Sequence, residues 1–91
     1  MVKRIELLAK QIETNVPGAK VDFTLFPSGA AMLDVKRAGR LFVLSYLPQG
    51  HFGVDEVRDG EGFLTSYRFT SEEFEPAAKH LLALLADAQA A

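Results

Sequence analysis

The residues in this chain best suited to acid–base chemistry near neutral pH are its two histidines, His51 and His80. His51 begins a predicted strand, and strand alternation places it on the same face as Asp55 and Arg68. A histidine–carboxylate pair of this kind could serve an enzyme or a small-molecule site, with Tyr67 nearby. No serine or second base is placed to complete a nucleophilic site. An ordinary surface histidine is therefore the alternative interpretation of His51, and His80 is interpreted as structural.

Metal and cofactor sites are not predicted. The chain has no cysteine, which removes thiol chemistry and cysteine ligands. Acidic residues gather around the glycine-containing turn at 59–62, but their spacing does not follow a calcium-binding loop. The glycines also follow no phosphate-binding pattern.

Charge argues against nucleic acid as a partner. The net charge is −2, whereas general nucleic-acid binders carry a strong basic excess. The one basic cluster is Lys36, Arg37 and Arg40, which Arg58 and Arg68 could extend. No apolar run approaches the roughly 18 residues of a membrane span, and charged residues interrupt the N-terminal segment. We therefore expect a cytoplasmic protein with neither nucleic acid nor membrane as partner.

The elements that must position these residues follow from periodicity. Alternating apolar residues predict strands at 20–26, 30–36 and 41–47, a fourth from His51, and a fifth carrying Phe63, Thr65, Tyr67 and Phe69. The loop at 27–29 sets Phe23 opposite Leu33 and Asp22 opposite Asp34. The loop at 48–50 sets Tyr46 opposite Phe52 and Leu44 opposite Val54.

Helices are predicted at both ends of the chain. Residues 3–15 carry apolar side chains at helical spacing, and a second apolar stripe extends from Ala77 to Ala88. Thr70 and Glu73 have the form of a capping box, but Pro76 would interrupt that helix, so the sequence favours a short turn at 70–75 and a main helix with Pro76 in its first turn. Residues 1–91 are thus one α+β domain of order α-β-β-β-β-β-α, a two-layer sandwich with both helices on one face of an antiparallel meander.

The opposite face of the sheet is the predicted binding surface. The third strand is apolar on both sides, which fits a strand covered on both faces by its own chain or one covered by a partner. Contiguous exposed apolar surface usually marks an interaction site, although a mixed surface with scattered apolar residues is the alternative. The predicted contact residues are Met32, Leu41, Val43, Leu47, Val57 and Leu64.

These observations favour a non-enzymatic protein-binding module that engages a partner protein or a second copy of itself. The alternative is a small-molecule binder or enzyme with a pocket near His51, Asp55 and Tyr67. In layout the chain resembles several kinds of small bacterial α+β protein, including secretion chaperones and toxin-immunity proteins. That resemblance implies inhibition or escort of another protein and assigns no residue a role.

Overall fold

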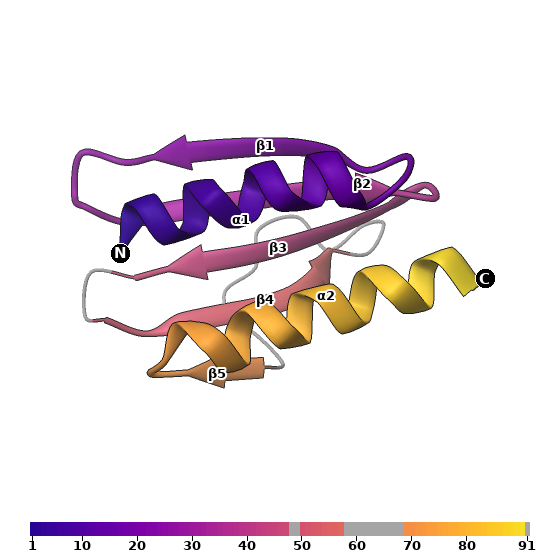
Figure 1. Ribbon diagram of the computed structural model, residues 1–91. Coiled ribbons are helices and arrows are strands. Elements are labelled where there is room, and N and C mark those ends of the chain that lie inside the picture. The colour runs from indigo at the N-terminus through magenta and orange to yellow at the C-terminus, as the bar shows by residue number, and fades with distance from the viewer. Residues whose placement is uncertain (48–49, 58–68, 91) are drawn as a thin grey trace.

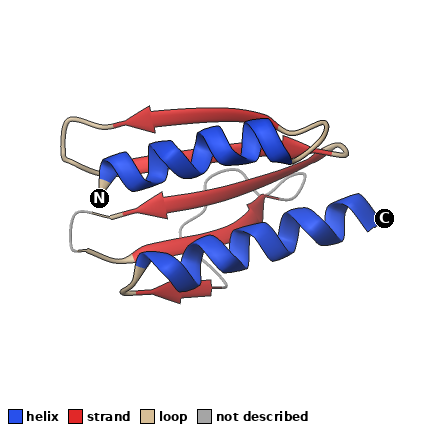
Figure 2. Ribbon diagram, viewed as in Figure 1, coloured by secondary structure: helices blue, strands red, loops and turns tan. Residues whose placement is uncertain are grey.

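The computed structural model describes residues 1–47, 50–57 and 69–90. Within those ranges the strands form one antiparallel sheet of order β1-β2-β3-β4-β5, and both helices lie on one face of it (Figures 1 and 2). The predicted two-layer α+β arrangement is confirmed. The elements are α1 (Val2–Asn15), β1 (Lys20–Leu25), β2 (Ala31–Arg37), β3 (Arg40–Tyr46), β4 (Phe52–Val57), β5 (Phe69–Ser71) and α2 (Phe74–Ala90).

Strand register follows the apolar alternation. Phe23 lies opposite Leu33 and Asp22 opposite Asp34, as predicted, and the pairing of β3 with β4 sets Leu44 opposite Val54. A shift of one residue would turn the apolar row away from the helices, which is why the pattern determines the pairing. The register therefore fixes which side chains share each face of the sheet.

The turn between β2 and β3 consists of Ala38 and Gly39, because Arg37 and Arg40 are paired on either side of it. Both turn residues have positive φ, 54° at Ala38 and 74° at Gly39. This is the geometry of a two-residue type I′ hairpin, which favours Asn-Gly. An alanine there is strained, since its Cβ approaches the following carbonyl oxygen.

Ala38→Asn is expected to raise the free energy of unfolding by about 1 kcal/mol, because asparagine tolerates the left-handed conformation. Urea unfolding of the two chains measures the difference. Ala38→Val, with a branched side chain at the same φ, should change stability in the opposite direction. Equal stability of all three chains would contradict this description of the turn.

The start of α2 does not use the capping box that Thr70 and Glu73 could form. Thr70 lies in β5, opposite Gly53, so its backbone belongs to the sheet. The local hydrogen bond instead runs from the Glu73 amide to Ser71 Oγ, at 3.0 Å. Edge pairing with β4 outcompetes a cap here, because it satisfies backbone groups that a single side-chain bond would leave open. Pro76 lies in the first turn of α2, as expected.

The core lies between the helices and the sheet. Each helix contributes one apolar stripe, and the strands contribute alternate residues from β2, β3 and β4. Phe69 of the predicted fifth strand lies opposite Val54, while Phe63, Thr65 and Tyr67 are outside the described residues. Neither described helix is long and apolar enough to cross a membrane. The largest fully buried side chains are Phe42, Phe52, Ile5, Ile12, Leu33, Leu44, Leu81, Leu85, Val35 and Val54.

Candidate functional site

The face of the sheet opposite the helices, which we call the back face, is not open at its centre. Val43 is 3% exposed, and its neighbours Ser45 and Asp55 are also buried within the single chain. The expectation of an exposed Val43 is therefore wrong. Of the two interpretations of the third strand, the structure supports a strand covered on both faces by its own chain.

The other predicted contact residues of the back face lie around that buried centre. Leu47 is 39% exposed, beyond the end of β3. Met32, Leu41 and Val57 are half-buried. Leu64 lies outside the described residues. Among the described residues of this face, what remains exposed is thus a margin rather than a continuous apolar patch.

Of the predicted polar site, the structure describes His51 and Asp55, and these two residues lie apart. His51 is exposed, whereas Asp55 is buried, four residues further along the same chain. At about 3.3 Å per residue, that spacing separates them by about 13 Å. Asp55 Oδ1 accepts a hydrogen bond from the neighbouring Glu56 amide at 2.8 Å. Tyr67 and Arg68 lie outside the described residues.

Alternation along the chain divides the predicted basic cluster. Lys36 is exposed on the back face, whereas Arg37 is buried on the helix side and donates to the Leu85 carbonyl at 2.9 Å. Arg40 makes two hydrogen bonds to the Glu56 carboxylate, at 2.8 and 2.6 Å. These bonds raise the pKa of Arg40 above its ordinary value and keep its charge neutralised locally. The three cations therefore do not form one basic surface.

Two carboxylates face each other across β1 and β2. Asp22 lies opposite Asp34, in a shallow hollow of about 430 Å³ that Lys20, Lys36 and Leu41 also line. Partial burial and the charge of Asp22 raise the pKa of Asp34, while Lys36 acts in the other direction. Within the described ranges, no group of three or more potential ligands is placed to hold a metal ion. We therefore expect the Asp22–Asp34 pair to affect stability, and we do not assign it a ligand.

Asp34→Asn is expected to raise the free energy of unfolding at pH 7 by about 0.2–1 kcal/mol, the range for directly opposed cross-strand pairs. The pKa of Asp34 is higher in the folded chain than the ordinary 3.8. The folded state therefore binds this proton more tightly, and the wild-type chain loses stability as pH rises from 3.8 through the folded pKa. The gain in the free energy of unfolding from Asp34→Asn should therefore appear as pH rises from 3.8 through the folded pKa, and should be absent at pH 3. Urea unfolding at both pH values checks this, and an equal benefit at each would contradict it.

The two helices enclose a groove on the outer surface of the helix layer. Both begin at the same end of the molecule and run in the same direction over the sheet (Figure 1). An ion pair between Arg4 and Glu75 joins their first turns, and the Arg4 guanidinium lies 4.6 Å from the centre of the Phe74 ring. Between the helices lies a cavity of about 620 Å³.

The groove has an apolar floor and exposed apolar walls. Leu8, Phe74 and Ala78 form the floor and are nearly buried. Leu7 and Leu82 stand on opposite walls and are 62% and 42% exposed. Burying a fully exposed leucine gains about 1.5–3 kcal/mol, so these two partly exposed leucines would each gain roughly half of that. The groove therefore offers two apolar anchor points above a ready-made apolar base.

The polar rim of the groove is basic. Arg4 and Glu75 neutralise one another, which leaves Lys10 and Lys79 as the uncompensated charges beside Gln11, Thr14 and Asn15. Neither lysine makes an ion pair with another described residue. An occupant with acidic side chains flanking an apolar face would complement this rim.

The sequence contained one indication of this groove. Leu7 lies off the stripe formed by Ile5, Leu8 and Ile12, so it cannot share their burial. Leu82 was part of the broad apolar stripe of the second helix and gave no separate indication. The distance between two helices is set by packing on the sheet, and no local pattern reports it.

Comparisons with known proteins add no relationship to these observations. The chain was compared with protein-family models, with curated proteins and with solved structures, and none of the three gives a match.

Proposed function

We propose that this protein is a non-enzymatic protein-binding module that holds an amphipathic helical segment of a partner in the groove between α1 and α2. The observation that carries the proposal is a pair of exposed leucines, Leu7 on α1 and Leu82 on α2, that line the same groove above an apolar floor. A concave groove with an apolar floor and a few polar groups on its rim is the usual form of a binding site.

A helix suits the shape of this groove. The groove runs between two helices that lie in the same direction, and a third helix fits such a trough through anchors at i, i+3, i+4 and i+7. Lys10 and Lys79 on the rim favour acidic residues beside those anchors. The proposed partner segment is therefore an acidic amphipathic helix.

An enzymatic role has less support from the geometry. Catalytic sites bring titratable groups together with converging polar contacts. In the groove, Arg4 and Glu75 are engaged with each other, and the predicted pair of His51 and Asp55 is separated along the chain. Because Val43 is buried, we assign docking to the groove rather than to the back face. The cytoplasmic location expected from the sequence remains part of the proposal, to be checked by cell fractionation.

The proposal predicts which peptides the protein selects. A displayed library would carry apolar residues at i, i+3, i+4 and i+7, with the remaining positions varied among Glu, Lys and Gln. The wild-type chain should enrich Glu-rich members. Leu7→Asp and Leu82→Asp should each weaken binding of a selected peptide by about tenfold or more, the value of one lost leucine contact.

Two further variants make the test specific. Lys79→Glu should shift the selection from acidic toward basic peptides. Leu47→Asp alters an exposed leucine outside the groove and should leave binding unchanged. Loss of binding in Leu47→Asp together with normal binding in Leu82→Asp would move the docking site to the back face and overturn the proposal.

A further inference from the structure

The outer edge of β1 has backbone groups positioned to pair with a further strand. β1 is the first strand in the sheet order, and its side chains are exposed or half-buried. The Phe26 amide donates inward to the Ala30 carbonyl at 2.9 Å. Because hydrogen-bonding direction alternates along an antiparallel strand, the N–H and C=O groups of Val21, Phe23 and Leu25 point outward. Proline and bulges, which usually protect such an edge, are absent from β1.

One symmetric register suits this edge better than its neighbours. An antiparallel pairing of β1 with a second copy, centred on Phe23, sets Val21 opposite the copy's Leu25 and Asp22 opposite the copy's Thr24. All outward backbone groups of the strand are then paired. Centring on Asp22 instead would place two like charges face to face. Centring on Val21 would set Leu25 opposite Pro17 of the copy, which lies outside the strand and has no N–H to donate.

The register centred on Phe23 also covers apolar surface. Leu25 is 55% exposed, although it lies on the helix side of the sheet. Its neighbour across the new pair would be Val21 of the copy, itself only half-buried. Both residues thereby gain an apolar contact that neither has in the single chain.

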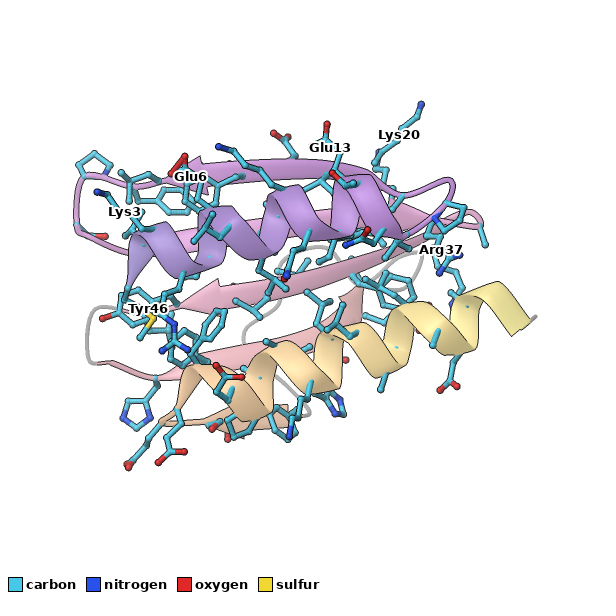
Figure 3. The ribbon with its side chains drawn as sticks, viewed as in Figure 1. Lys3, Glu6, Glu13, Lys20, Arg37 and Tyr46 are labelled. Atoms are coloured by element: carbon cyan, nitrogen blue, oxygen red, sulfur yellow. The ribbon has the colours of Figure 1, made fainter. Side chains whose placement is uncertain are left out.

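The helix above this edge carries a self-complementary charge pattern. Lys3, Glu6, Lys10 and Glu13 are all exposed, and their spacing places them along one side of α1. Figure 3 shows Lys3, Glu6 and Glu13 along the side of α1 that borders β1. Two copies of α1 in antiparallel contact set Lys3 against Glu13 of the copy. The same symmetry sets Glu6 against Lys10, so every contact joins opposite charges.

Strand and helix are compatible with the same symmetry axis. α1 packs against β1 and β2, and α1 and β1 run in opposite directions along the same stretch of the molecule (Figure 1). Phe23 lies near the middle of β1, and the charge pattern is symmetric about the middle of α1. Because each α1 packs on the edge strand β1 and its neighbour β2, strands that pair at about 4.8 Å bring the two helices toward each other.

From this agreement we infer that the protein forms a two-fold dimer. In this dimer β1 pairs with β1 of a second copy, and the charged stripe of α1 contacts the same stripe of the copy's α1 in antiparallel orientation. The dimer has one continuous sheet across both copies. The groove between α1 and α2 keeps its other lining residues outside this interface, and Lys10 is the one residue that belongs to both the groove rim and the charged stripe.

Charge exchange on the stripe tests this dimer. Lys3→Glu/Lys10→Glu makes the stripe wholly acidic, and Glu6→Lys/Glu13→Lys makes it wholly basic. Sedimentation equilibrium should show a wild-type dimer and, for each variant alone, self-association weakened by about tenfold or more at low salt. An equimolar mixture of the two variants should restore dimers, and native mass spectrometry should identify them as mixed.

Controls separate this interface from others. Glu72→Lys/Glu73→Lys makes the same charge change at exposed positions outside α1 and should still dimerise. Leu25→Pro removes an outward N–H without disturbing pairing with β2, and should be monomeric, whereas Leu25→Ala keeps the N–H and should associate. Circular dichroism confirms that each variant is folded. A monomeric wild-type chain, charge variants that dimerise normally, or a mixture that fails to restore dimers would each overturn the inference.

Discussion

Val43→Asp is expected to lower the free energy of unfolding by about 3–5 kcal/mol, the cost of an uncompensated buried charge. Val43 is 3% exposed within the single chain. Its cross-strand neighbours are Asp34 on β2 and Asp55 on β4, so the new carboxylate would stand between two others. The free energy of unfolding of a small domain is roughly 5–15 kcal/mol, so this loss would be a large fraction of the total stability. Urea unfolding followed by circular dichroism measures it.

Leu47→Asp is the matched control for this prediction. Leu47 follows β3 and is 39% exposed, so the same substitution there should cost no more than about 0.5 kcal/mol. An open binding surface centred on Val43 makes a different prediction, in which Val43→Asp abolishes association while stability is kept. That outcome would restore the back face as the docking surface.

Phe52→Ala is expected to cost about 3–5 kcal/mol, the usual range for removing a fully buried aromatic side chain. Phe52 is 1% exposed and connects both layers of the protein. Its ring centre lies 5.1 Å from that of Tyr46 in β3 and 5.9 Å from that of Phe74 in α2, in an edge-on arrangement. Loss of Phe52 removes support from beneath Phe74, so peptide binding in the groove should weaken as well.

Phe26→Ala provides the comparison for Phe52. Phe26 is 40% exposed next to the β1–β2 turn, and its removal should change stability by no more than about 0.5 kcal/mol. Similar losses at the two positions would contradict the assignment of Phe52 to the centre of the core.

The register of the sheet could be predicted because period-two alternation and short turns leave little choice. Phe23 opposite Leu33 and Leu44 opposite Val54 are the pairings that keep apolar residues on one face. Thr70 does not cap α2, and the reason is physical. Thr70 has the correct residue type, but cap propensity is weaker than backbone pairing with the free edge of β4.

Burial of the back face and the groove could not be predicted from the pattern. Alternation indicates that Val43 and Asp55 share a face, but not whether that face is covered. The separation of His51 from Asp55 follows from strand rise alone, so this part of the polar site could have been excluded from the sequence. The groove depends on how far apart α1 and α2 lie, which is a property of tertiary packing.

The most direct test of the proposed function is to map the amide chemical shifts of the isotope-labelled full chain as a selected acidic amphipathic peptide is added. The proposal predicts shifts concentrated at Leu7, Ala78, Lys79 and Leu82, along both walls of the groove. Shifts concentrated instead at Leu41, Leu47 and Val57 on the back face would contradict it.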